Sequence, residues 1–158
     1  MVFVILQGGC VTITKENVEA PLDSTKAYVQ QYQHRGSWGI FGSYEKCDVT
    51  SVGTAADQDG FDLVKRGDQL FARVTPGKKR LDLFLCYSPK GMWHGPGYNK
   101  TSVVAELQAN TTYVFAVERG EDAITIAVCE KDTGKVVSEK VSVGVSYTFS
   151  PPLLIPLL

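Results

Sequence analysis

The stretch DQLFARVTPGKKRLDLFLCY, residues 68–87, decides the fold, because apolar and polar side chains alternate along it on both sides of a proline-glycine pair. Successive side chains of a β-strand point to opposite faces, so a period of two residues is the pattern of a half-buried strand. The apolar face of the two arms comprises Leu70, Ala72, Val74, Leu81, Leu83, Leu85 and Tyr87. Both arms are therefore predicted to be strands with one face in a core.

The two arms are joined by TPGK, residues 75–78, which has the composition of a type II turn. Pro76 fixes φ at the first corner, and Gly77 can adopt the positive φ that the second corner requires. We therefore expect residues 68–87 to form a β-hairpin. Its register should be firmly set, because a slip by one residue would turn the leucines to the opposite face.

The rest of the chain repeats this pattern, and no segment of it has the apolar period of a helix. Segments rich in Val, Ile, Thr, Tyr and Phe are bounded by Gly, Pro, Asn and Asp, which is typical of strands and their turns. The further predicted strands are 26–33, 44–51, 111–118, 123–131 and 135–149, with weaker ones at 10–14 and 61–65. Gly144 lies inside 135–149, where a bulge or a close backbone approach is expected.

About eight short strands in a chain of 158 residues predict an all-β fold, and specifically an antiparallel β-sandwich in a single domain over residues 1–158. A closed barrel is the alternative. With 44% hydrophobic residues, a chain of this length can bury a core without a metal ion or a disulfide. No cofactor is expected.

The charge of the chain argues against nucleic acid as a partner. The net charge is −1 and the pI is about 6.1, whereas binding to phosphates relies on a local excess of Lys and Arg. The tightest basic cluster is Lys78, Lys79 and Arg80, directly after the turn. We interpret this cluster as a solvated turn rather than a polyanion site.

The cysteines are spaced too widely for a local zinc or redox motif. Cys10, Cys47, Cys86 and Cys129 never pair as C-x-x-C. The even number of cysteines permits two disulfides if the chain is exported, but small disulfide scaffolds contain more cysteine than this. Buried free thiols are the favoured interpretation.

Both ends of the chain are apolar but short. Residues 1–10, MVFVILQGGC, lack the basic start and the length of a secretory signal or a membrane span. A bacterial lipoprotein in the cell envelope is the alternative if the chain begins further upstream. Residues 150–158, SPPLLIPLL, are broken by prolines and cannot cross a bilayer as a helix, so we expect them to pack on this fold or on a neighbour.

Three stretches together resemble a pattern of small bacterial envelope proteins. They are RVTPGKKRLDLFL at 73–85, VVAELQANTTYVFAVE at 103–118 and ITIAVCEKDTGKVVSEKV at 124–141. The pattern is that of PEGA-like domains and their relatives of unknown function, which are commonly lipoproteins; Asn110 stands where it usually has Gly. The resemblance covers about residues 69–141 and implies an immunoglobulin-like or prealbumin-like sandwich with no catalytic residues to carry over.

Catalytic and metal sites have little support in the sequence. Nucleophilic catalysis would need His94 beside Cys47 or Cys86, and no local motif arranges this. His34 is expected to be an exposed hydrogen-bonding residue. The acidic segment ADQDGFD, residues 56–62, could offer oxygen ligands to calcium, but a turn stabilised by its own Asp side chains explains it better. No metal site is predicted.

Two aromatic, glycine-rich segments are the candidate binding elements. YSPKGMWHGPGYNK, residues 87–100, and HRGSWGIFGSYEK, residues 34–46, are both interpreted as connections between strands. Loops at the surface often carry function, and large aromatic rings are seldom exposed without a partner. The alternative is that these rings fold inward and cap the sandwich. The candidate ligand-binding residues are Trp38, Tyr44, Trp93, His94 and Tyr98.

The sequence thus favours a non-catalytic β-sandwich module that binds a protein or glycan partner through its Trp-bearing loops. A second hypothesis is an assembly protein that forms homo-oligomers through sheet edges and the apolar tail at 151–158. A third is a small hydrolase that uses His94 with a cysteine or a carboxylate.

Overall fold

The computed structural model describes residues 4–6, 9–11, 22–38, 41–54, 58–87, 97–120 and 122–146. Side chains are placed in 22–34, 45–54, 59–87, 97–120 and 122–146. All regular elements in these ranges are β-strands, as the alternating pattern predicts. The described residues contain no helix that could span a membrane.

The structure contains the following strands in chain order. Their bounds are β1 Val4–Leu6, β2 Gly9–Val11, β3 Ala27–Gln30, β4 Tyr32–Trp38, β5 Phe41–Gly53, β6 Gln58–Asp59, β7 Asp62–Arg66, β8 Gln69–Val74, β9 Gly77–Tyr87, β10 Gly97–Leu107, β11 Thr112–Arg119, β12 Ala123–Glu130 and β13 Val141–Gly144. There are more strands than the predicted eight or so, partly because the predicted strand at 26–33 is broken in two. In addition, β10 was not predicted, and its first residues belong to the predicted connection at 87–100, which is therefore wrong for 97–100.

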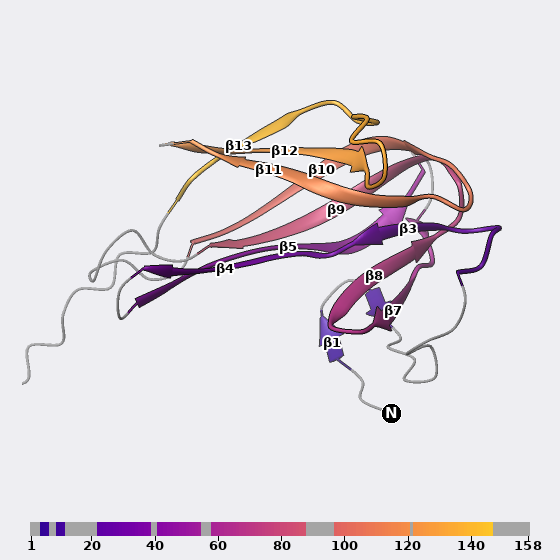
Figure 1. Cartoon of the computed structure of the whole chain (residues 1–158), viewed down its shortest axis with the longest axis horizontal. Coiled ribbons are helices and arrows are strands. Elements are labelled where there is room, and N and C mark those ends of the chain that lie inside the picture. Colours follow the sequence, from indigo (N-terminus) through magenta and orange to yellow (C-terminus); the bar gives the residue numbers. More distant parts are fainter. Residues whose placement is uncertain are drawn as a thin grey trace, which may run out of the picture.

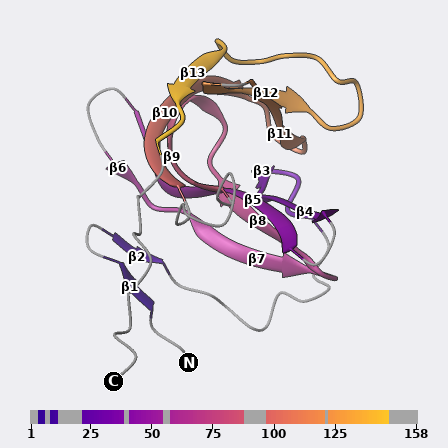
Figure 2. The same ribbon diagram turned by 90° about the vertical axis from the view of Figure 1, so that its left-hand side faces the viewer.

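Two sheets form the body of the molecule (Figure 1). The smaller sheet has the order β10-β9-β5-β4, with β6 also paired to β5, and the larger sheet has the order β13-β12-β11-β3-β8-β7. β1 and β2 pair separately (Figure 2). Among the described strands, β3 and β11 form a parallel pair and the others pair antiparallel. The all-β fold with two antiparallel-rich sheets is therefore confirmed, and it is consistent with a β-sandwich.

The core lies between the two sheets and takes alternate residues from both. Leu81, Leu83, Leu85 and Tyr87 of β9 are at most 3% exposed, as predicted, and Ala72 and Val74 of β8 are also buried. From the larger sheet, the core also receives Ala27, Val29, Tyr113, Phe115, Ile124, Ile126 and Val128. Burial of these side chains provides the main stabilisation of the fold.

The predicted hairpin at 68–87 is wrong. β8 belongs to the larger sheet, where it pairs with β3 and β7, whereas β9 belongs to the smaller sheet, where it pairs with β5 and β10. The turn therefore carries the chain from one layer to the other, and the apolar faces of β8 and β9 meet across the core. Gly77 does adopt a positive φ of 118°, the region that favours glycine. Alternation alone cannot distinguish a hairpin from a crossing between two sheets, because both require one apolar face on each strand.

The predicted strand at 26–33 is split at Gln31, where the chain leaves the larger sheet and enters the smaller one. The Gln31 N–H donates to the C=O of Leu70, and its side-chain Oε1 accepts from the N–H of Val49 at 2.7 Å. The β5 ladder to β9 is irregular between Val49 and Ser51. Gln31 is only 6% exposed, so this buried amide joins the two sheets at the crossing.

The predicted connection at 34–46 is also wrong, because most of it is strand. β4 and β5 pair without interruption from Tyr32 opposite Cys47 to Trp38 opposite Phe41. His34 is exposed, as expected, but it lies within β4 rather than at a strand end. This hairpin extends the smaller sheet beyond the end of β9 (Figure 1).

The predicted strand at 135–149 forms only β13 and two isolated bridges within its described part. Residues 136–138 lie between the two sheets and join them along one side. Their backbone contacts are bridges from Val136 to Cys129 of β12 and from Ser138 to Ala105 of β10, with hydrogen bonds from Val137 N–H to Val128 and from Glu106 N–H to Val137. Gly144 ends β13, and a Cβ there would meet no atom within 4 Å. The expected bulge or close approach at Gly144 is therefore not found.

Candidate binding face

The topology brings the two aromatic segments to the same end of the smaller sheet. Tyr87, the last residue of β9, lies opposite Glu45 of β5 and opposite Gly97, the first residue of β10. The described strands that lead into residues 39–40 and into residues 88–96 therefore end on the same side of one sheet (Figure 1). Segments about fifty positions apart in the sequence thus meet at one location.

The predicted site residues are only partly covered by the structure. Trp38 lies in β4 and Tyr44 in β5, so neither is in an irregular loop, and their side chains lie outside the described part. Trp93 and His94 lie outside the described residues. Tyr98 is placed in full, in β10, and it is the residue from which the site can be built.

The Tyr98 side chain is 49% exposed on the outer face of the smaller sheet. Its ring stacks with the ring of Phe84 in β9, with a centroid distance of 5.8 Å and an interplanar angle of 24°. Tyr98 lies opposite Cys86 and is thus diagonal to Phe84, a spacing within reach of aromatic side chains. The pair forms a small aromatic surface that leaves much of Tyr98 accessible.

Charged residues surround this pair in two rows across three strands. The first row is Lys46, Cys86 and Tyr98, and the second is Asp48, Phe84 and Lys100. These residues define what we term the aromatic face: Lys46, Asp48, Phe84, Cys86, Tyr98 and Lys100. Neighbouring strands lie about 4.8 Å apart and successive rows about 7 Å apart, so the face has roughly the dimensions of one or two sugar rings.

The charges on the aromatic face are not equivalent. Lys46 and Asp48 form an ion pair, and their side chains are 32% and 20% exposed. Burial raises the pKa of Asp48, and the hydrogen bond and charge of Lys46 oppose that shift. Lys100 is exposed, and no hydrogen bond or ion pair to another described residue is found for it.

Tyr87 packs on the inner side of the same strands and is held there by several hydrogen bonds. Its ring is buried against Gly97, and its hydroxyl donates to the C=O of Ser146 at 2.9 Å. The same hydroxyl accepts from the N–H of Ser146 at 2.9 Å and from Nδ2 of Asn99 at 3.1 Å. Asn99 Nδ2 also donates to the C=O of Gly144 at 2.6 Å. These bonds join β9 and β10 to the chain after β13.

A small cavity lies in the interior at this end. Its volume is about 10 Å³, and its lining residues include Tyr32, Cys47, Leu85 and Val117. This volume is at the lower limit for one water molecule, so this cavity cannot hold a sugar ring. Arg119 of β11 and Glu45 of β5 form an ion pair at 2.6 Å beside the cavity and link the two sheets there.

The thiols are in surroundings that disfavour nucleophilic chemistry. Burial raises the pKa of Cys47 to about 12, and burial also raises the pKa of Cys86. Cys47, Cys86 and Cys129 are free, as expected, and Cys47 and Cys129 are buried. Cys47 faces the core whereas Cys86 lies on the outer face. The side chains of Cys10 and His94 are outside the described part, so a hydrolase that uses His94 stays a prediction.

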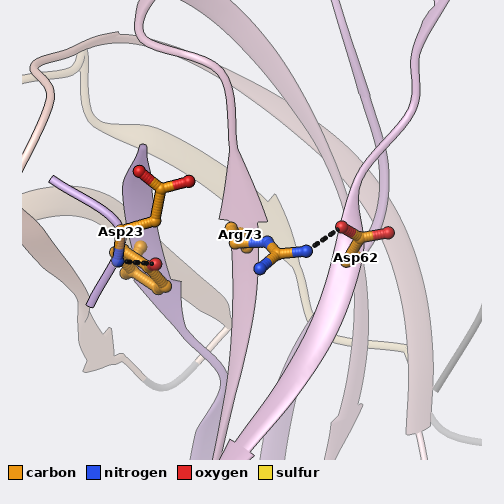
Figure 3. A network of polar contacts seen from close by, with 4 residues as sticks. Asp23, Asp62 and Arg73 are labelled. Atoms are coloured by element: carbon orange, nitrogen blue, oxygen red, sulfur yellow. Dashed lines mark hydrogen bonds and ion pairs between the residues drawn. The ribbon is translucent and has the colours of Figure 1, made fainter. Parts of the chain in front are cut away.

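The acidic segment at 56–62 uses its described carboxylates in ion pairs. Asp62 of β7 pairs with Arg73 of β8 at 2.5 Å, and Figure 3 shows the Arg73 guanidinium pointing toward it and away from Asp23. Asp59 pairs with Lys79, whose side chain is buried, so Lys79 does not belong to a solvated turn as we expected. The Lys79 side chain is buried because it lies on the inward face of β9. No metal-binding group of three or more side chains occurs in the described ranges, and Asp57 lies outside them.

Sequence reasoning missed Phe84 and Lys100. Phe84 is not on the apolar face that alternation predicts for its strand, and a large aromatic ring on the opposite face was a signal for a functional outer face. Lys100 gave no signal, because its place beside Phe84 depends on the pairing of β9 with β10.

Comparison with models of protein families, with curated proteins and with solved structures finds no match.

Proposed function

We propose that the protein is a non-catalytic β-sandwich module that binds a glycan on the aromatic face. The observation that carries this proposal is Tyr98, 49% exposed and stacked on Phe84 on the outer face of the smaller sheet. Aromatic rings offer an apolar surface to the C–H groups of a sugar, and neighbouring charged groups can bind its hydroxyls. Lys46, Asp48 and Lys100 supply such groups.

The size of the apolar surface favours a glycan over a protein partner at this face. A stable protein interface buries about 800 Å² on each side around an apolar centre. On the described part of the outer face, the large exposed apolar residues are Tyr98 and Val104. They lie six positions apart on β10, about 20 Å, so they do not form one patch. The aromatic face suits one or two sugar rings better than a protein surface.

We expect the variant Tyr98→Ala to weaken glycan binding about tenfold, because it removes the exposed ring of the stacked pair. Glycan-array screening would identify a ligand, and titration calorimetry with that ligand would measure the change in Kd. Val104→Ala is the matched control, since Val104 is similarly exposed on the same strand but distant from the face. Binding that is equally strong in both variants would refute the proposal, as would an array on which no glycan binds.

A second candidate function, assembly through sheet edges, is favoured by β11. β3 pairs with β11 only at Thr112 and Tyr113, and the remainder of β11 has β12 as its described partner on one side. In an antiparallel pair, every second residue of a strand forms hydrogen bonds to its partner strand. Lys131 N–H donates to the C=O of Thr112, so it is the even-numbered residues of β11 that bond to β12. The backbone groups of Phe115 and Val117 therefore point away from β12. Such an edge can add a strand from another chain.

If β11 mediates assembly, the native protein should have a dimeric or larger mass by light scattering, and Val117→Pro should lower it to that of the 17.3 kDa monomer. Proline at this position removes an N–H that makes no bond to β12, so the fold should persist. Deletion of residues 151–158 tests the tail separately. A native mass that stays monomeric up to millimolar concentration would rule out this candidate.

A further inference from the structure

We infer that the glycan bound at the aromatic face carries a carboxylate, which interacts with Lys100 while a sugar ring stacks on Tyr98. This inference rests on the proposed function and names the chemical class of its ligand. It depends on the difference in ion pairing between the two lysines of the face. Lys46 is neutralised by Asp48, whereas no acidic partner of Lys100 is found among the described residues.

The neighbours of Lys100 on its own strand and on the adjacent strand do not supply an anion. Tyr98 and Ser102 flank it on the same face of β10, and Phe84 lies opposite it in β9. Asp82 lies one row further along and pairs with Arg80 at 3.2 Å. Asp48 is two strands away, about 10 Å, and is bound by Lys46. An exposed ammonium group in this position attracts an anionic ligand group.

The spacing suits a sugar acid. Tyr98 and Lys100 are two positions apart on one face of β10, so their Cα atoms are about 7 Å apart. The flexible four-carbon stem of lysine lets its ammonium group reach the edge of a ring that lies on Tyr98. A hexuronic acid carries its carboxylate on the edge of the ring, where Lys100 can bind it. The ion pair is solvent-exposed, so it should discriminate between ligands more than it raises affinity.

The test compares trigalacturonic acid with its methyl ester, which has the same rings without the charge. We expect the native protein to bind the acid about fourfold more tightly than the ester at low ionic strength, and the preference should disappear near 1 M salt. Lys100→Gln should abolish the preference and leave the affinity for the ester unchanged. Lys135→Gln, at an exposed lysine beyond β12, is the matched control and should keep the preference.

A second variant should increase the preference for the acid over the ester instead of abolishing it. Asp48→Asn frees Lys46 from its ion pair, so the preference for the acid should increase about two- to fourfold. If these residues had a purely structural role, Lys100→Gln and Asp48→Asn would not change the preference for the acid in opposite directions. Thermal unfolding of each variant verifies that the fold is intact.

The outcomes separate this inference from the proposed function. Equal affinity of the native protein for acid and ester, with both weakened by Tyr98→Ala, would overturn the inference and leave the glycan-binding proposal in place. Tighter binding of an oligoglutamate peptide than of trigalacturonic acid would overturn both and indicate an acidic protein partner. An absence of binding to every saccharide tested would also overturn both.

Discussion

Replacing Gly97 with Ala should lower the free energy of unfolding by about 3 kcal/mol, because there is no room for the added methyl group. A Cβ at this position would lie 1.9 Å from Cε2 and 2.4 Å from Cζ of Tyr87. The Tyr87 ring cannot easily move away, since it is 1% exposed and its hydroxyl is bonded to Ser146 and Asn99. Urea denaturation monitored by circular dichroism would measure the loss.

Gly144→Ala is the matched control for Gly97→Ala. Gly144 also lies at the end of a strand next to Asn99, but a Cβ there meets no atom within 4 Å, and its φ is not positive. Its substitution should change the free energy of unfolding by no more than about 0.5 kcal/mol. Similar effects of the two substitutions would show that Gly97 is not in contact with Tyr87 in solution.

Tyr87→Phe should destabilise the protein by about 2 kcal/mol, although it removes a single oxygen atom. That oxygen takes part in three hydrogen bonds, one donated to Ser146 and two accepted from Ser146 and Asn99. Without it, the Ser146 amide loses its partner, and hydrogen exchange at that amide should accelerate. Ser146 is exposed, so water replaces part of the lost bonding and limits the loss of stability.

Tyr113→Phe provides the comparison for Tyr87→Phe. Tyr113 is equally buried, but its hydroxyl accepts one bond, from the N–H of Gln108 at 2.7 Å. We expect a loss of about 1 kcal/mol for this variant and no change in exchange at Ser146. A larger loss for Tyr113→Phe than for Tyr87→Phe would mean that the bonds to Ser146 contribute little to stability.

Local sequence patterns predicted the elements of this fold better than their partners. Alternation correctly placed Leu81, Leu83, Leu85 and Tyr87 in the core, and the turn residues correctly required a positive φ at Gly77. The pairing of β8 with β9 was wrong because a hairpin and a crossing between layers bury the same faces. Pairing is decided by contacts distant in sequence, such as β3 with β8 and β5 with β9, and the alternation within one segment does not reveal which other segment it pairs with.

Breaks in strands were predicted least well. Gln30 and Gln31 interrupt an apolar alternation, and the second of them is the buried amide at which the chain changes sheets. A polar pair inside a predicted strand is the signal that could have located this break. Asn110 has a φ of 56°, a conformation that glycine favours and that Asn tolerates better than most residues, so the residue type fits the backbone at this turn.

Of the five predicted binding residues, Tyr98 is the one whose side chain lies in the described part, and its place in the fold was not foreseen. Tyr98 was expected in a loop, but it lies in a strand, because pairing of β9 with β10 continues to Gly97 opposite Tyr87. Its partner Phe84 and the charged rows became evident only from the register of three strands. Trp93 and His94 remain candidate ligand-binding residues, since they lie outside the described part.

The backbone bonds of residues 136–138 to both sheets have a mechanical consequence. They close the side of the core that β10 and β12 border, so the layers cannot part along this side without breaking those bonds. On β5 and β11, the ion pair of Glu45 with Arg119 adds a second link between the layers. The two sheets are thus tied by a main-chain strap as well as by the packing of their apolar faces.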